Sequence, residues 1–257
     1  MTRRGAGRHS SWPVALLVCA VCLVVLSATP VGAALLQRVR GADPAPVVTI
    51  TKGPAPSDPP VSVGPAAVVA ASTLPDLLAV RPETTTPPYR RDLFEHWIDA
   101  DRDGCNTRSE VLIEESTTPV TITGRCRISG GTWVSPMDGT VAFEPGDIEI
   151  DHHVPLAEAW RSGASAWSDA RRRAFANDLD VPYALVASST MANQSKGDKD
   201  PGRWLPTNGA YVCEYVTAWA LVKYRWSLAV DEREQTALRA NLSGACGDHL
   251  VTLPPVM

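Results

Sequence analysis

A short strand that stops at a proline gives one segment of this chain a well-defined local geometry. In Asp147–Trp160 the apolar residues Ile148 and Ile150 alternate with acidic ones, which predicts a β-strand. The strand runs into Asp151–His153 and ends before Pro155, because proline has no N–H for a sheet ladder. A carboxylate and an imidazole are therefore expected side by side at a strand end.

A second stretch, Met191–Pro201, offers complementary groups. It holds an amide, Asn193, followed by Lys196 and Asp198. Carboxylate and amide oxygens suit a hard divalent cation such as Mg²⁺. A neutral histidine beside such a metal can take a proton from water, and a lysine can contact a phosphate. The two stretches together predict a one-metal phosphodiesterase site.

The order Asp-His-x-x-Pro, an apolar strand and then Asn-x-x-Lys-x-Asp resembles the HNH endonucleases, also called ββα-metal nucleases. The resemblance is to the Asp-His…Asn branch, which includes the HNH domain of RNA-guided DNA nucleases. It covers about Asp147–Pro206, and the wider pattern is similar to secreted HNH-family proteins. The resemblance implies that Asp151 and Asn193 bind the metal. It also implies that His152, three residues before the proline, is the general base.

Two features leave this assignment open. Position 184 is alanine where the family has an asparagine that opens the second strand, and Asn177 could replace it. Some HNH relatives use a His-His pair as ligand and base. In that alternative His152 binds the metal, His153 takes the proton, and Asp151 lies outside the metal's direct ligands.

The remaining expectations for this site concern its cations and its substrate. Lys196 is expected to contact the phosphate as part of the catalytic site, and Asp198 to orient it or a metal ligand. The expected metal is Mg²⁺ or another divalent cation such as Mn²⁺, with Zn²⁺ as an alternative. The expected substrate is nucleic acid, and DNA in particular. No obligate protein partner is implied.

The N-terminus predicts export. Arg3, Arg4 and Arg8 precede an uncharged apolar stretch over residues 12–28, and small residues follow it up to Ala33. This pattern predicts a signal peptide over residues 1–33. An uncleaved membrane anchor is the alternative, because the uncharged run exceeds the roughly 20 residues that span a bilayer. Both alternatives make the rest of the chain extracellular, either secreted or anchored facing outside, with membrane contact only if the segment is uncleaved.

Proline content separates a linker from a domain. Residues 41–88 hold half of the 22 prolines of the chain, a composition typical of an extended tether. We expect a disordered linker over residues 34–73 and an HNH nuclease domain over residues 74–257. Leu74–Val80 is apolar enough to dock on that domain.

The cysteines agree with export. Cys19 and Cys22 fall in the signal segment, and the even number that remains predicts disulfides in an exported domain. We expect the sequential pairing, Cys105–Cys126 and Cys213–Cys246, because each bond closes one supersecondary unit. A zinc site is less favoured because the four cysteines after the signal segment show no Cys-x-x-Cys spacing.

The charge balance argues against a large nucleic-acid footprint. The chain has 24 Lys and Arg against 28 Asp and Glu, and none of the acids precedes residue 41. Nucleic-acid binders usually present a basic surface. A degradative enzyme, however, needs turnover rather than tight binding. Positive charge is also expected near the site, from Arg171–Arg173 among others.

An acidic loop, Asp99–Glu110, follows a predicted amphipathic helix over residues 89–98. Asp99, Asp101, Asp103 and Glu110 occupy positions that match the EF-hand loop formula. Cys105 stands where the loop gives a backbone carbonyl, and such loops usually occur in pairs. The alternative is an acid-rich turn that caps the following helix.

The remaining periodicity indicates an α+β fold in which the ββα-metal motif lies among helices with a small antiparallel sheet. Further helices are expected over residues 156–166, 168–179, 208–226 and 231–242, and further strands near residues 120–123, 126–128, 132–134, 140–143 and 183–187. The expected function is an exported, metal-dependent endonuclease. A catalytically inactive HNH-fold binding module and an extracellular calcium-binding interaction protein are the alternatives.

Overall fold

The computed structural model describes residues 67–257. The expected signal peptide and most of the expected linker lie outside these residues. The helices with at least one α-turn are α3 Thr107–Glu114, α4 Leu156–Arg161, α5 Asp169–Ala176, α6 Thr190–Lys196, α7 Val212–Arg225, α8 Glu232–Asn241 and α9 Ala245–Asp248. Shorter 3-10 turns are η1 Ala71–Asp76, η2 Arg91–Leu93, η3 Ala164–Ala166 and η4 Gly209–Tyr211.

The strands pair as small antiparallel hairpins or ribbons. They are β1 Val68–Ala70, β2 Val120–Thr123, β3 Arg127–Gly130, β4 Trp133–Val134, β5 Val141–Ala142, β6 Glu149–His152, β7 Leu185–Ser188 and β8 Leu250–Thr252. The pairs are β1 with β8, β2 with β3, β4 with β5 and β6 with β7. Helices and small antiparallel sheets thus make an α+β fold, as expected.

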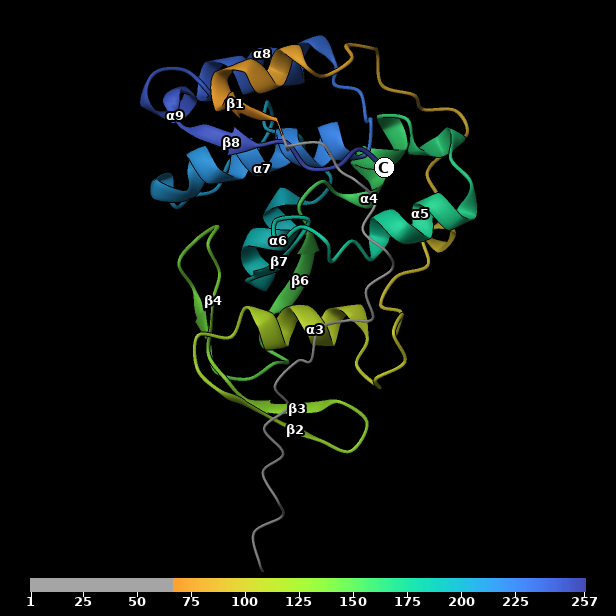
Figure 1. Cartoon of the computed structure of the whole chain (residues 1–257), viewed down its shortest axis with the longest axis vertical. Coiled ribbons are helices and arrows are strands. Elements are labelled where there is room, and N and C mark those ends of the chain that lie inside the picture. The colour runs from red at the N-terminus through yellow and green to blue at the C-terminus, as the bar shows by residue number, and fades with distance from the viewer. Residues whose placement is uncertain (1–66) are drawn as a thin grey trace, which may run out of the picture. The chain divides into compact units, whose positions relative to one another are not determined.

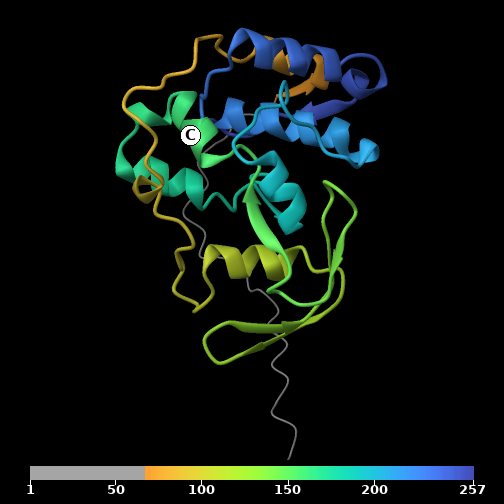
Figure 2. The same cartoon turned by 180° about the vertical axis from the view of Figure 1, so that it is seen from behind.

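Two hydrophobic clusters meet at the two-stranded β6–β7 sheet. Figures 1 and 2 show this sheet between α3 on one side and the α7 and α8 layer on the other. Ile150 of β6 belongs to the smaller cluster, around Trp133 and α3. Val154, just past the strand, belongs to the larger cluster around Trp219 of α7. The end of β6 is therefore held between two packed cores.

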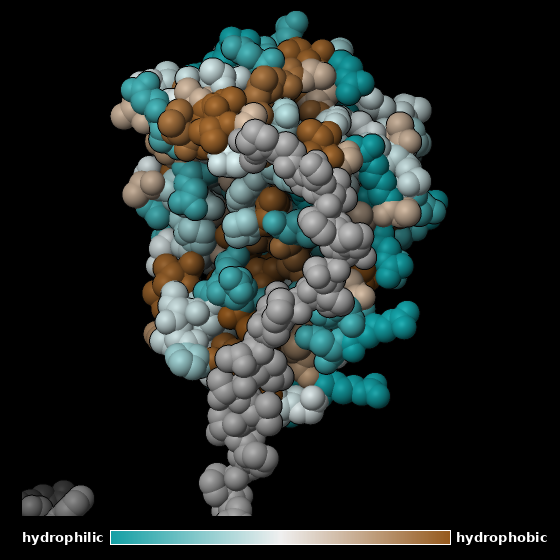
Figure 3. Space-filling model, in the orientation of Figure 1, coloured by the Kyte–Doolittle hydropathy of each residue, from teal (hydrophilic) through white to brown (hydrophobic). Residues whose placement is uncertain are grey.

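One described strand lies before Leu74, the expected first residue of the domain. Val68–Ala70 forms β1, which pairs with Leu250–Thr252 near the C-terminus. On the face in Figure 3, apolar surface gathers over these two strands, where Val68 and Leu250 are exposed. The two strands pair because two short apolar segments, near the two ends of residues 67–257, can satisfy each other's backbone hydrogen-bonding groups.

The helix predicted over residues 89–98 is wrong. Only the 3-10 turn Arg91–Leu93 forms there, and Trp97 has a left-handed φ of 61°. Phe94 is fully buried against Trp160 and Phe175, whereas Trp97 packs against the smaller cluster. The two aromatic residues enter different cores, so tertiary packing overrides the helical periodicity.

Two of the other expected helices are interrupted. Gly163, with a φ of 133°, separates α4 from the 3-10 turn Ala164–Ala166. A second 3-10 turn, Gly209–Tyr211, precedes α7. The cap expected at Ser168 is confirmed, because its side chain accepts a hydrogen bond from Arg171 N at the start of α5.

Both expected disulfides are present, Cys105–Cys126 and Cys213–Cys246.

The aromatic side chains Tyr215 and Trp219 of α7 are core residues, since both are fully buried. No helix within residues 67–257 has the length and apolar character needed to cross a membrane.

Candidate functional site

The two-stranded β6–β7 sheet and α6 bring the two predicted stretches together. Glu149 and Asp151 lie two residues apart on β6 and therefore share one face of the strand. Asn193 and Lys196 lie three residues apart on α6 and share one face of the helix. Two side-chain contacts join the strand to the helix: Asn193 contacts Glu149, and Lys196 contacts Asp151.

Glu149 makes the first contact. Asn193 Nδ2 donates a hydrogen bond to Glu149 Oε2 at 2.5 Å. Because the amide nitrogen is used there, Asn193 Oδ1 is the atom left for another partner. Glu149 was not predicted as a site residue, although its position two residues before Asp151 on the same strand face could have indicated it.

Lys196 makes the second contact. Its Nζ donates to Asp151 Oδ2 at 2.7 Å and to the His152 carbonyl at 2.9 Å. The Lys196 side chain is fully buried. Burial raises the pKa of Asp151 and lowers the pKa of Lys196, and their mutual attraction opposes both shifts. Asp151 Oδ1 is left without a hydrogen bond among residues 67–257.

His152 is held in one orientation. Its Nε2 lies 2.9 Å from the Ala176 carbonyl, which can only accept, so Nε2 carries the hydrogen and Nδ1 has a free lone pair. Trp97 stacks on the imidazole with ring centroids 5.3 Å apart, and His96 lies edge-on. Burial, above all, lowers the pKa of His152 to about 3. The ring is therefore neutral near pH 7.

His153 points into the core instead. It is completely buried, and its Nε2 lies 2.9 Å from the Tyr215 carbonyl, so that this nitrogen donates. Its Nδ1 and the Tyr215 hydroxyl are both buried without a hydrogen-bond partner. Burial lowers the pKa of His153 to about 3 as well.

A cavity of about 260 Å³ opens on the predicted residues. Its lining includes Asp151, His152 and Asn193 but not His153. Two residues from a segment far upstream, Tyr89 and Arg91, also line it.

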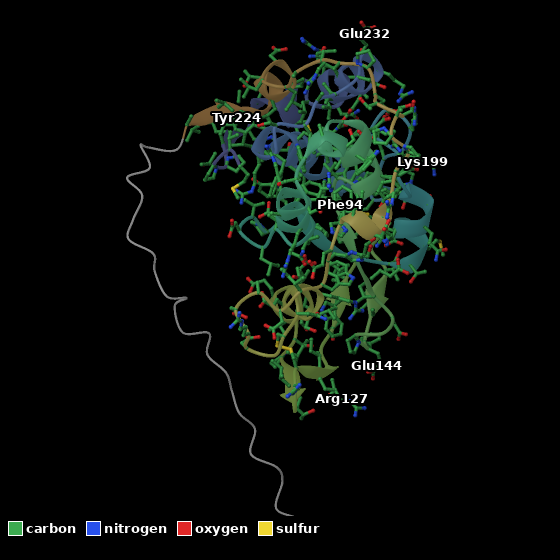
Figure 4. The ribbon with its side chains drawn as sticks, turned by 90° about the vertical axis from the view of Figure 1, so that its right-hand side faces the viewer. Phe94, Arg127, Glu144, Lys199, Tyr224 and Glu232 are labelled. Atoms are coloured by element: carbon green, nitrogen blue, oxygen red, sulfur yellow. A yellow bond between two sulfur atoms is a disulfide. The ribbon has the colours of Figure 1, made fainter. Side chains whose placement is uncertain are left out.

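The charged side chains that follow Asn193 in the sequence have other partners than expected. Lys196 lies behind Asp151 and does not line the cavity, so the expected phosphate contact is corrected to a contact with the carboxylate. Asp198 does line it, but it accepts a hydrogen bond from Arg161 at 2.7 Å rather than contacting Lys196. Lys199 lies at the periphery of the molecule, as Figure 4 shows, with its Nζ on the Ser195 carbonyl.

The arginine triplet also lies away from the cavity. Arg171 donates to the carbonyls of Trp226 and Met257, and Arg173 pairs with Glu95. Their buried neighbour Arg172 donates to backbone carbonyls around α5. The cation that does line the cavity, Arg91, was not predicted, because its sequence position is far from both motifs.

Neither Ala184 nor Asn177 makes the hydrogen bond that orients the imidazole of His152, which is made by the Ala176 carbonyl. Ala184 is buried, and its carbonyl accepts a hydrogen bond from His153 N. Asn177 does not contact His152. Its Oδ1 accepts from Thr107 Oγ1 and Ile98 N, and its Nδ2 donates to the Glu95 carbonyl. Asn177 thus holds the segment around Trp97, the residue that stacks on the imidazole of His152, through backbone hydrogen bonds.

The acidic loop is compact but lacks the preceding helix of an EF-hand. One carboxylate oxygen from each of Asp99, Asp101 and Asp103 lies within 4.8 Å of the others. Asp99 Oδ2 accepts from Gly104 N and Asp103 Oδ1 accepts from Cys105 N. Glu110, the expected twelfth residue of the loop, lies within α3.

The donor atoms at the cavity fit a hard divalent cation. Asp151 Oδ1 and Asn193 Oδ1 are oxygen ligands of the type that Mg²⁺ and Mn²⁺ prefer. Both residues line the same cavity and each keeps an oxygen without a hydrogen bond among residues 67–257.

Comparison with known proteins gives the family. Residues 107–241 match the family described as GmrSD restriction endonucleases, C-terminal domain. A relative from Arthroderma benhamiae, described as an uncharacterized secreted protein, is 41% identical over 196 residues, which cover 76% of this chain and 94% of the relative. No solved structure matches the chain. The resemblance to HNH nucleases is confirmed: this chain belongs to the family of GmrSD restriction endonuclease C-terminal domains, an HNH-type family.

Proposed function

We propose that this protein is an exported, divalent-metal-dependent endonuclease that hydrolyses phosphodiester bonds of DNA. The observation that carries the proposal is the convergence of Asp151, His152 and Asn193 on one cavity. The endonuclease family to which residues 107–241 belong supports the same reaction class. In this proposal β6, β7 and α6 form the ββα-metal motif.

His152 would act as the general base. Its Nε2–H is held by the Ala176 carbonyl, so Nδ1 is the atom that accepts a proton from the attacking water. The water oxygen bonds to phosphorus as this proton leaves, the bond from phosphorus to the 3′ oxygen breaks, and the leaving oxygen takes a proton from solvent. A depressed pKa keeps His152 unprotonated over the whole neutral range.

Asp151 and Asn193 would hold the metal. A bound divalent cation supplies charge stabilisation for the phosphate and the leaving oxygen. Glu149 would fix the amide of Asn193 with its oxygen free, and Lys196 would fix Asp151. Outer contacts of this kind orient metal ligands. Lys196 is therefore assigned as a positioning residue.

Export belongs to the same proposal. The relative from Arthroderma benhamiae bears the name of a secreted protein, and the two disulfides suit an oxidising compartment. We propose a cleaved signal within residues 1–33, a linker after it and the nuclease domain as the mature part.

A plasmid-nicking assay on the purified full chain tests the activity. We expect supercoiled DNA to be nicked with Mg²⁺ or Mn²⁺ and to stay intact in EDTA. Cleavage that persists in EDTA would overturn the metal mechanism. Failure to cleave DNA under any metal, with the fold intact, would favour the inactive binding module instead.

The acidic loop supports a second, separate site. We propose that Asp99, Asp101 and Asp103 bind a structural Ca²⁺, because their carboxylate oxygens already converge within 4.8 Å. The site would stabilise the loop before α3 and would not take part in the reaction.

A further inference from the structure

The upstream segment Tyr89–Trp97 contributes Tyr89 and Arg91 to the lining of the cavity, although it precedes the residues 107–241 that match the family. It reaches the site because Phe94 is fully buried in the larger core and contacts Trp160 and Phe175. This anchor brings Arg91 to the cavity that Asp151, His152 and Asn193 also line. Arg91 is exposed, so its guanidinium is accessible to a substrate.

Arg91 differs from nearby arginines because it has no carboxylate partner among residues 67–257. Arg90 is paired with Asp92, and Arg161, near the rim of the cavity, is paired with Glu158 and Asp198. Arg91 takes part in no ion pair within residues 67–257, and it is the only cation among the described residues that line this cavity. The positive charge of Arg91 is therefore available to a phosphodiester that enters the cavity.

The imidazole of His96 contacts the guanidinium of Arg91. His96 Nδ1 donates to the Phe94 carbonyl at 2.7 Å, which leaves Nε2 as an acceptor. Arg91 donates to that Nε2 through one terminal nitrogen at 3.3 Å. A guanidinium has five N–H donors, so donors remain for an anion beside those that contact His96 and the Tyr89 hydroxyl. His96 also lies edge-on to His152, so the contact between Arg91 and His96 places Arg91 near the proposed base.

We propose that Arg91 binds a non-bridging oxygen of the scissile phosphodiester and stabilises the charge that develops on it. This assignment rests on the proposed nuclease function. Asp151 of β6 and Asn193 of α6 would hold the cation at this cavity, and Arg91 lines the same cavity from the upstream segment. The substrate class that fits is a phosphodiester backbone, because a planar fork of N–H donors matches phosphate oxygens.

Two measurements on the full-length protein test the proposal. The variants are Arg91→Ala and Arg91→Lys, with Arg90→Ala as the matched control, because Arg90 is paired with Asp92 and does not line the cavity. The first measurement is steady-state cleavage of a labelled 20-base-pair duplex with Mg²⁺. The second is binding of the same duplex in EDTA, by fluorescence anisotropy, over a series of salt concentrations.

We expect Arg91→Ala to lower kcat/KM roughly 100-fold and to reduce the slope of log affinity against log salt by about 0.9. Arg91→Lys keeps the charge but not the fork, so it should keep the slope and regain part of the rate. Arg90→Ala should match wild type in both. Arg91→Ala that matches Arg90→Ala in rate and slope would overturn the proposal. Loss of rate by Arg91→Ala and Arg91→Lys alike, with unchanged slopes, would also overturn it.

The binding measurement separates this proposal from the nuclease function. A wild-type protein that cleaves nothing would defeat the proposed function, yet the slope in EDTA would still decide whether Arg91 binds a phosphate. A wild-type protein that cleaves, with Arg91→Ala cleaving equally well, would defeat Arg91 alone. Arg91 is exposed, and equal melting temperatures for the variants would exclude misfolding as the cause of a lost rate.

Discussion

Two adjacent histidines share the end of β6 but have different surroundings. His152 lines the cavity and keeps Nδ1 free, whereas His153 donates to the Tyr215 carbonyl inside the core. The difference follows from the alternation of side chains along a strand, which sends neighbours to opposite faces. It favours His152 as the base and disfavours the His-His alternative, in which His153 would have to reach solvent.

Alanine substitutions of His152 and His153 should have different effects. We expect His152→Ala to lower kcat by about 10²–10⁴ while leaving Mn²⁺ affinity unchanged, because a base is not a ligand. His153→Ala should mainly destabilise the fold, by roughly 1–3 kcal/mol, because the Tyr215 carbonyl loses its donor. Cleavage kinetics, Mn²⁺ titration calorimetry and urea unfolding measure the three quantities. An inactive His153→Ala beside a His152→Ala that loses the metal would reverse the assignment.

Glu149 should act through the amide of Asn193. Glu149→Ala removes the acceptor at 2.5 Å, so the amide can rotate and its oxygen is no longer directed. We expect the Mn²⁺ dissociation constant to rise about 10–100-fold. Glu149→Gln keeps an acceptor and should show a smaller rise. Glu144→Ala, at an exposed acid, is the control. A Glu149→Ala protein that binds Mn²⁺ like the control would contradict this role.

At the level of elements, the end of α3 carries a carboxyl group that makes stability depend on pH. Glu115 accepts a hydrogen bond from Ala187 N of β7 at 2.8 Å. Burial, the largest cause, nevertheless raises its pKa to about 7. An acid whose pKa is raised on folding favours the folded state when protonated. The stability it contributes is fully present below pH about 4.5 and is lost as the pH rises to about 7.

Glu115→Gln should remove this dependence while keeping an acceptor for Ala187 N. We expect wild type to lose up to roughly 3 kcal/mol of unfolding free energy, relative to the variant, between pH 4.5 and 7.5. Urea unfolding of both proteins at the two pH values gives the difference. Parallel pH profiles would mean that Glu115 titrates normally in the folded protein.

The acidic loop should respond to calcium. If Asp99, Asp101 and Asp103 bind Ca²⁺, millimolar calcium should raise the melting temperature, since a ligand of the folded state stabilises it. Asp101→Ala should abolish that increment and leave DNA cleavage largely intact, with Glu144→Gln as the control. An unchanged melting temperature of wild type in calcium would return the loop to an acid-rich turn.

Local patterns predicted part of this site, and long-range packing decided the rest. The strand that ends before Pro155 and the cap at Ser168 could be predicted because each depends on a few neighbouring residues. The disulfide partners could be predicted because sequential pairing closes one supersecondary unit with each bond. The role of Lys196 could not, because burial beside Asp151 is a tertiary property. The helix expected over residues 89–98 failed for the same reason.

At the scale of the whole molecule, a buried ionic cluster joins the site to the C-terminal helices. Lys223 of α7 donates to Glu158 of α4 at 2.8 Å and to Glu234 of α8 at 2.7 Å. Although burial lowers it, the two carboxylates hold the pKa of Lys223 above its ordinary value. Glu158 also accepts from Arg161, which in turn holds Asp198 at the cavity. The position of the cavity rim therefore depends on packing between three helices.

Breaking this cluster should cost much more than removing an exposed lysine. Lys223→Met leaves the Glu158 and Glu234 carboxylates buried without their shared cation, so we expect a loss of about 3–5 kcal/mol in unfolding free energy. Lys199→Met, at the surface, should change it by less than about 0.5 kcal/mol. Urea unfolding measures both. If Lys223→Met is as stable as Lys199→Met, the two carboxylates must be protonated in the folded protein. A triple variant, Lys223→Met with Glu158→Gln and Glu234→Gln, tests this directly. It should regain stability over Lys223→Met alone if the loss comes from unpaired buried charge.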